Sequence, residues 1–142
     1  MADETVEAKR KKILVVDDDP DCLEVLGTML ESSGFDALGV NSNANAFTLL
    51  RDHPELFDLL VTDYETREVT GIELAMLVNM MRHAQGKHSL PMVLMSAGNH
   101  LGEDVVSDAG FSASLKKPFS LRELRDAVTL ALKEGGNDQT NA

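Results

Sequence analysis

The stretch that decides the fold is an apolar run followed by three acidic residues and a proline, Ile13-Leu14-Val15-Val16-Asp17-Asp18-Asp19-Pro20. A short apolar run of this kind is typical of a strand that is buried on both faces in a parallel sheet. Asp19 and Pro20 mark a helix start, because Asp caps helices and Pro is tolerated in the first turn. The sequence therefore predicts a strand over residues 12–16 that is followed directly by a helix.

The alternation of a short apolar run with a helical pattern repeats along the chain. Strands are predicted over residues 12–16, 35–40, 57–62, 92–96 and 111–116. Helices are predicted to begin near Pro20, Ser42 or Asn43, Gly71, Gly102 and Ser120. Strands that alternate with helices predict parallel units with right-handed crossovers, so we expect an α/β fold with helices on both faces of one sheet. The apolar spacing places Leu77 and Leu121 on the inward faces of their helices.

The composition is that of one globular domain. The chain has 142 residues, of which 43% are hydrophobic, and a formal net charge of −11. This charge argues against nucleic acid as a partner, because nucleic-acid binding draws on Lys and Arg. No run approaches the ~18 apolar residues of a membrane span, and no signal-peptide pattern is present. We therefore expect a cytoplasmic protein without membrane insertion, whose one cysteine, Cys22, is a small buried hydrophobe in the first helix.

The ordered domain is expected over residues 12–134. Residues 1–11 are a charged lead-in without apolar periodicity, which we expect to be flexible. Residues 135–142 begin with Gly135 and Gly136 and continue as a polar segment, so we expect the last helix to stop there and a flexible tail to follow.

Polar side chains stand where the predicted strands end. Asp17 and Asp18 follow the first strand, Asp63 follows the third, Ser96 the fourth and Lys117 the fifth. Because an open parallel sheet binds its ligands at the carboxyl ends of its strands, we expect these residues to converge at one edge.

Three carboxylates at one edge predict a cation site. Each close pair of like charges repels by ~4 kcal/mol at an effective dielectric constant of 20, and a cation relieves that repulsion. An all-oxygen ligand set favours Mg²⁺ and also suits Mn²⁺. The alternative is that Asp17 and Asp18 only stabilise the start of the first helix. Asp63 has no such role, and Lys117 would add the positive charge that a phosphoryl group requires.

Four motifs together resemble the receiver domain of two-component response regulators. They are Ile-Leu-Val-Val-Asp17-Asp18-Asp-Pro, Leu-Val-Thr-Asp63 with Gly71 eight residues on, Leu-Met-Ser96-Ala97-Gly98, and Leu-Lys-Lys117-Pro118-Phe119. The resemblance covers residues 12–133. It implies a stand-alone, single-domain receiver with a flavodoxin-like (βα)5 doubly wound parallel sheet of strand order 2-1-3-4-5.

The resemblance also implies a metal-ligand set. Asp18 corresponds to the direct acidic ligand of Mg²⁺, and Asp17 to the acid that acts through a bound water. Asp63 supplies a further carboxylate oxygen, and Glu65 stands where the family uses a backbone carbonyl.

The remaining roles that the resemblance implies concern phosphoryl transfer. Asp63 corresponds to the phosphoacceptor, which attacks the phosphohistidine of a sensor histidine kinase or a histidine phosphotransfer protein. Ser96 corresponds to the hydroxyl that moves toward the phosphoryl group, and Lys117 to the lysine that stabilises its charge. The peptide bond between Lys117 and Pro118 is expected to be cis.

Three positions depart from the family pattern. Thr66 and Arg67 stand where the family usually has Met-Pro, which alters the loop after Asp63. Ser114 stands where an aromatic side chain often couples the hydroxyl shift to output. Glu65 brings an acidic side chain close to the acidic pocket and is expected to tune the lifetime of the acyl phosphate.

The resemblance implies a phosphorelay switch rather than a conventional enzyme. A downstream target protein is expected at the face formed by the fourth helix, the fifth strand and the fifth helix. The departures leave open a phosphorylation-independent interaction module. A phosphatase of the haloacid dehalogenase type is a third hypothesis, because Asp17-x-Asp19, Ser96 and Lys117 also resemble that family's motifs. The phosphatase would require another acidic pair at a strand end after the lysine, whereas Asp126 lies in a predicted helix.

Overall fold

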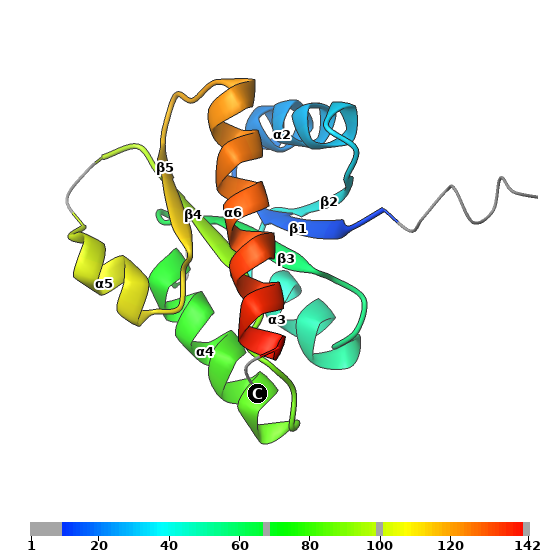
Figure 1. Ribbon diagram of the computed structural model, residues 1–142. Coiled ribbons are helices and arrows are strands. Elements are labelled where there is room, and N and C mark those ends of the chain that lie inside the picture. Colours follow the sequence, from blue (N-terminus) through cyan, green and yellow to red (C-terminus); the bar gives the residue numbers. More distant parts are fainter. Residues whose placement is uncertain (1–9, 67–68, 99–100, 141–142) are drawn as a thin grey trace, which may run out of the picture.

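A computed structural model describes residues 10–66, 69–98 and 101–140 of the chain. Its centre is a five-stranded parallel sheet in the order β2-β1-β3-β4-β5 (Figure 1). The strands are β1 (Lys12–Val16), β2 (Asp36–Val40), β3 (Leu59–Asp63), β4 (Met92–Ser96) and β5 (Ala113–Lys116). The helices are α2 (Pro20–Ser32), α3 (Asn43–Asp52), α4 (Gly71–Ala84), α5 (Glu103–Asp108) and α6 (Leu121–Thr140). The predicted fold class and strand order are confirmed.

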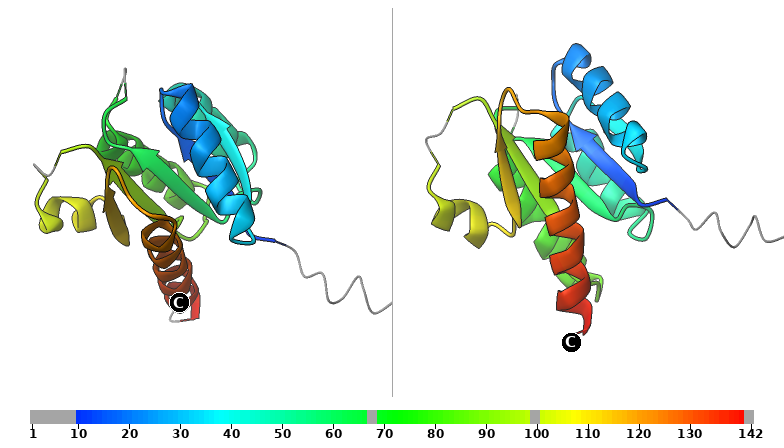
Figure 2. Two further views of the ribbon diagram at one scale, coloured as in Figure 1. Left: turned by 90° about the horizontal axis from the view of Figure 1, so that it is seen from above. Right: turned by 45° about the horizontal axis from the view of Figure 1, so that its top comes forward.

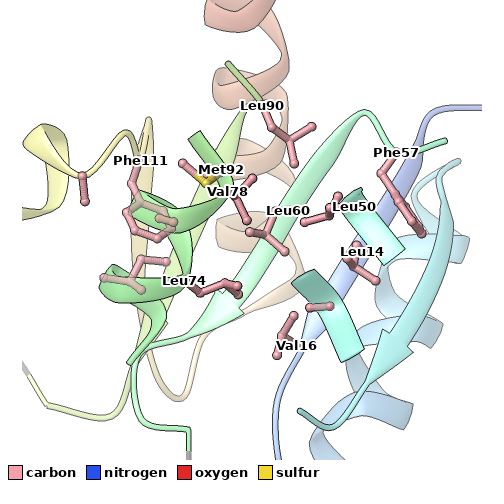
Figure 3. Close-up of a cluster of buried hydrophobic side chains, with 14 of the residues drawn as sticks. Leu14, Val16, Leu50, Phe57, Leu60, Leu74, Val78, Leu90, Met92 and Phe111 are labelled. Carbon is pink, nitrogen blue, oxygen red and sulfur yellow. The ribbon is translucent and has the colours of Figure 1, made fainter. Parts of the chain in front are cut away.

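Two hydrophobic clusters hold the helices to the sheet. One lies between the sheet and helices α3, α4 and α5, and Figure 3 shows Leu14, Leu60 and Leu74 within it. The other lies on the opposite face, where Leu30 of α2 and Val128 of α6 pack against the sheet. Because β1, β3 and β4 are buried on both faces, their sequences read as continuous apolar runs rather than as alternating patterns.

Two strands begin two residues later than the sequence predicts. β3 begins at Leu59 rather than at residue 57, and β5 begins at Ala113 rather than at residue 111. Phe57 and Phe111 precede these strands and are only 4% and 5% exposed. A buried aromatic residue before a strand has the same apolar signal as a residue within it, so the pattern alone does not separate the two.

Local capping residues set the starts of the helices. The side chain of Asp19 accepts a hydrogen bond from the backbone N–H of Asp21, as the Asp-Pro start predicts. Ser120 and Glu123 cap α6 reciprocally, with N···O distances of 2.8 and 3.1 Å. Thr70 and Glu73 form a second such capping box at α4, which the sequence analysis did not identify. This box fixes the end of the loop that follows Asp63.

Some helical positions differ from the prediction. Leu77 is 45% exposed and Leu121 is 38% exposed, so neither points into the core. The helix α6 is continuous past Gly135, where the sequence predicts its end, and runs to Thr140 (Figure 2). A Cβ at position 135 would lie 2.5 Å from Cγ of Pro91, so glycine allows close packing at that point. Glycine weakens a helix by only ~1 kcal/mol relative to alanine and does not forbid it. The flexibility of the ends of the chain remains a prediction.

Arg82 of α4 is a buried cation that joins two loops at the amino edge of the sheet. It is 9% exposed, and its guanidinium donates to the carbonyl of His88 at 2.8 Å and to that of Pro54 at 3.0 Å. None of the helices in the described part of the chain is long and apolar enough to cross a membrane.

We expect Arg82→Met to destabilise the domain by about 2–4 kcal/mol, because it leaves two partly buried carbonyls without donors. Urea unfolding would measure the loss. Arg51→Met is the matched control, since Arg51 is an exposed arginine of α3 whose ion pair with Asp52 is also exposed, and it should leave the midpoint unchanged. Equal midpoints for the two variants would show that the buried guanidinium does not hold the two loops.

Candidate functional site

The register of the sheet brings the ends of four strands to one edge. Val16 pairs with Thr62, Thr62 pairs with Leu94, and Ser96 pairs with Lys116. Because these strands are parallel and end at nearly the same level, the residues that follow them share one edge, as the sequence analysis predicts for an open sheet.

Asp17, Asp18 and Asp63 form a carboxylate cluster at this edge. Each offers an oxygen, and these oxygens lie within 4.8 Å of one another. Asp17 is 1% exposed and Asp63 is 6% exposed, whereas Asp18 is half-buried. Oxygen-only donors at this spacing match the preference of Mg²⁺ for carboxylates and waters. The residues present therefore fit the divalent cation that the sequence predicts.

Both carboxylate oxygens of Asp17 already have donors from the chain. Oδ1 accepts a hydrogen bond from the backbone N–H of Asp19 at 3.0 Å, and Oδ2 accepts one from Nζ of Lys117 at 2.8 Å. This occupancy agrees with the implied role of Asp17 as an acid that acts through water. Asp18, which comes next along the chain, remains the candidate for a direct ligand.

The carboxylate of Asp63 is buried, and its ionised form is disfavoured. Burial raises the pKa of Asp63 above its ordinary value; Lys117 opposes this increase, and the charge of Asp17 adds to it. Nζ of Lys117 lies 3.4 Å from Oδ2 of Asp63, and the backbone N–H of Glu65 donates to the carboxylate. A cation at the cluster would favour the ionised, nucleophilic form.

Lys117 bridges two of the three acids. Its peptide bond to Pro118 is cis, as expected, and its backbone N–H donates to the carbonyl of Ser96 at 2.8 Å. Burial alone would lower the pKa of Lys117, but the hydrogen bond to Asp17 and the charge of Asp63 raise it above its ordinary value. Lys117 therefore remains an ammonium ion at neutral pH.

The hydroxyl of Ser96 is hydrogen-bonded within its own loop. It donates to the carbonyl of Gly98, so it must leave that bond before it can donate to a group on Asp63. Beside it lies a hollow of about 110 Å³ whose lining includes Leu101, Val106 and Ser114. Ser114 is exposed, so its small side chain leaves this space open where the family often has a ring.

Gly71 packs directly against the end of β3. A Cβ at this position would lie 2.6 Å from the carbonyl oxygen of Asp63, a distance that real contacts do not show. The backbone N–H of Gly71 donates to the carbonyl of Tyr64 at 2.9 Å. The glycine that follows Asp63 by eight residues therefore closes the loop onto the site.

The sequence analysis missed the contacts of two residues, one at the acids and one at the loop after Asp63. Cys22 is half-buried, and its thiol hydrogen-bonds to Asp17. Burial is the main reason that the pKa of the thiol is raised, and the hydrogen bond to Asp17 raises it further. The prediction that Cys22 is a plain buried hydrophobe is therefore incomplete. Asn43 contacts Thr66 in the loop after Asp63. Arg67, the other departure in that loop, lies outside the described residues.

Comparison with known proteins identifies the class of domain. The family described as response regulator receiver domain matches residues 13–129. The chain is 34% identical over 130 residues to the two-component response regulator ORR21 of Oryza sativa, and the match covers 89% of this chain and 18% of that protein. The chain thus spans about a fifth of the length of the curated relatives it matches.

Solved structures agree with this result. A receiver domain protein described as CheY-like from Methanospirillum hungatei JF-1 has a TM-score of 0.78 at 22% identity, with 92% of this chain and 99% of that one covered. A response regulator receiver protein from Pseudomonas putida has a TM-score of 0.73 at 28% identity, with coverage of 86% and 98%. The chain belongs to the receiver domain family of two-component response regulators.

Proposed function

We propose that this chain accepts a phosphoryl group on Asp63 from the phosphohistidine of a sensor histidine kinase or a histidine phosphotransfer protein. The single observation that supports this proposal best is the position of Lys117, whose ammonium lies between the buried carboxylates of Asp17 and Asp63 beside a cluster able to hold a cation. Such an arrangement is suited to a group that carries several negative oxygens.

Asp17, Asp18, Asp63 and the backbone carbonyl of Glu65 would hold Mg²⁺, or Mn²⁺ in its place. The cation would neutralise charge on the phosphoryl oxygens and on the carboxylate that attacks. Asp17 would act through a water, because both of its oxygens already accept hydrogen bonds from the chain.

The other steps belong to the chain's own groups. An oxygen of Asp63 forms a bond to phosphorus while the bond from phosphorus to the histidine nitrogen breaks, and the electron pair stays on the imidazole. Lys117 neutralises developing charge on a phosphoryl oxygen, as preorganised cations do in such transfers. Ser96 exchanges its bond to the carbonyl of Gly98 for one to another phosphoryl oxygen.

The phosphorylated chain would act on another protein or pass the group onward. Receiver domains are generally not conventional enzymes, and we propose the same for this chain. Exposed apolar side chains on α5 and α6, Val105 and Leu121, support a target at the face of α5, β5 and α6. The stand-alone arrangement and the cytoplasmic location stay predictions.

A phosphorylation-independent interaction module is a second candidate function. The open hollow beside Ser114 favours it, because the ring that often couples this site to output is absent. The complete set of acids, hydroxyl and lysine favours phosphorylation.

Incubation with acetyl phosphate or a phosphohistidine donor tests the proposal. We expect one phosphoryl group per chain by intact mass when Mg²⁺ is present, and none when EDTA replaces it, because the acids would then lack their cation. The adduct should be lost in alkaline hydroxylamine, as acyl phosphates are. If several donors leave the mass unchanged, the interaction module becomes the better account.

A further inference from the structure

Asn43 joins the start of α3 to the loop after the phosphoacceptor strand. Its side-chain amide nitrogen donates to the hydroxyl of Thr66 and to the carbonyl of Val69. The hydroxyl of Thr66 also donates to the carbonyl of Val69. We call these three contacts the Asn43–Thr66–Val69 clasp. Asn43 lies 23 residues before Thr66 and 26 residues before Val69 in the sequence.

Asn43 is an unusual choice for packing alone. It is 3% exposed, and its side-chain oxygen is buried without a hydrogen-bond partner among the described residues. Because a buried polar atom without a partner destabilises the folded state, an apolar residue would serve the core better. The benefit of asparagine here must therefore come from its amide nitrogen, and both acceptors of that nitrogen belong to the loop.

The loop that the clasp holds begins directly after Asp63, at the carboxylate cluster. The ends of the loop are fixed, since Tyr64 donates to the carbonyl of Met95 at 2.7 Å and Gly71 donates to that of Tyr64. The backbone N–H of Glu65 donates to the carboxylate of Asp63. Since the peptide unit between Glu65 and Thr66 is planar, holding Thr66 in place restricts the orientations open to the carbonyl of Glu65. Asn43 therefore acts on a backbone segment that contacts Asp63.

The clasp also accounts for a departure from the family pattern. Thr66 stands in the place of the usual methionine and before the place of the usual proline, which would restrict the loop through its fixed φ. The hydroxyl of Thr66 is the group that both receives the bond from Asn43 and donates to Val69. Hydrogen bonds from Asn43 of α3 thus restrain the loop where the family usually relies on the ring of a proline.

We propose that Asn43 is a positioning residue for phosphoryl transfer, holding the loop through the clasp so that the backbone of Glu65 is fixed beside Asp63. This inference rests on the proposed function of Asp63. The described hydrogen bonds of Asn43 go to the loop rather than to the acids, so it acts through Thr66 and Glu65.

Asn43→Ala and Thr66→Val test the clasp from its two sides. We expect each to weaken Mg²⁺ affinity and to slow phosphorylation by roughly 10-fold, the range found when supporting groups of metal sites are removed. The fluorescence of Tyr64, the one tyrosine of the chain, would report Mg²⁺ titration. The double variant should lose little more than either single one, because both break the same contacts. In metal-free protein, hydrogen exchange of the Glu65 and Thr66 amides should accelerate.

Asn79→Ala is the matched control. Asn79 of α4 also has a buried side-chain oxygen without a partner among the described residues, and its nitrogen donates to Ala109 at 3.4 Å, away from the loop. This variant should lower the thermal midpoint without changing Mg²⁺ affinity or loop exchange. Should Asn43→Ala and Thr66→Val lose only thermal stability, as Asn79→Ala does, the clasp would be structural and the inference wrong. If the wild-type chain takes up no phosphoryl group, the proposed function itself is wrong. The wild-type control therefore separates failure of the proposed function from failure of the clasp inference.

Discussion

Asp63→Asn is expected to abolish phosphoryl transfer to this chain. The amide has almost the size and shape of the carboxylate, but its nitrogen and oxygen are not nucleophiles at neutral pH. Intact-mass measurement after incubation with acetyl phosphate and Mg²⁺ should therefore show full labelling of the wild type and none of the variant. No other change should have a larger effect, because the group that forms the new bond is removed.

The fold should tolerate this change well. Burial raises the pKa of Asp63 in the folded chain, so ionising this group lowers the stability of the fold. That cost is absent below the ordinary pKa of the acid and fully present above the raised one. At neutral pH without metal, Asp63→Asn should thus raise the thermal midpoint, and the gain should shrink as the pH falls through this range. If Asp63→Asn instead lost much of its stability, the absence of phosphoryl label on the variant would be explained by unfolding.

Asp58→Asn is the control for this experiment. Asp58 lies just before the same strand at its opposite end, where its carboxylate accepts a hydrogen bond from the backbone N–H of Lys12 at 2.9 Å. Its substitution should leave labelling intact. Undiminished label on Asp63→Asn would place the phosphoacceptor elsewhere and contradict the proposed function.

The acidic site was predictable because its geometry follows from the sheet. A buried parallel strand has a strong apolar signal, so the residues after it are located by the pattern alone. Parallel pairing then places Asp17 and Asp63 at one edge, and the register of Val16 with Thr62 agrees. Each step depends on local sequence or on a general rule of topology.

Other features depend on contacts that no local pattern encodes. The bond from Asn43 to Thr66 spans 23 residues, and from sequence Asn43 is only a candidate helix cap. Leu77 has helical spacing with its neighbours, yet it is exposed, because spacing does not show which side of a helix another element covers. Gly135 is a helix stop by propensity, but α6 continues through it, and the missing side chain lets the helix pack close to Pro91.

The hydrogen bond of Ser96 also indicates how phosphorylation would change the structure. Sequence places this hydroxyl at the site, whereas the structure has it donating to the carbonyl of Gly98. Phosphorylation would have to exchange one hydrogen bond for another, and the loop after β4 would lose a restraint. Because no ring of the described residues lines the hollow beside Ser114, movement of that loop is the most direct route to α5.

Lys117→Met should separate metal binding from phosphoryl transfer. We expect phosphorylation to slow by about 10²–10³-fold, as when one preorganised group that stabilises developing charge is removed. Mg²⁺ affinity should stay the same or increase, because a positive charge that contacts Asp17 and Asp63 is gone. Labelling rates at saturating Mg²⁺ and titration by Tyr64 fluorescence would measure the two effects independently.

The stability of this variant should depend on the metal. Asp17 is 1% exposed and loses its partner at 2.8 Å, and breaking a buried pair typically destabilises a protein by about 3–5 kcal/mol. The loss should be large in EDTA. Mg²⁺ stabilises the folded state of both proteins, so the loss should become smaller with Mg²⁺ to the extent that the variant binds the cation more tightly than the wild type. Lys116→Met is the control, because Lys116 is exposed and precedes the site by one residue. A Lys117→Met variant that labels at the wild-type rate, or that loses Mg²⁺ affinity along with labelling, would contradict the assignment of Lys117 to the phosphoryl group.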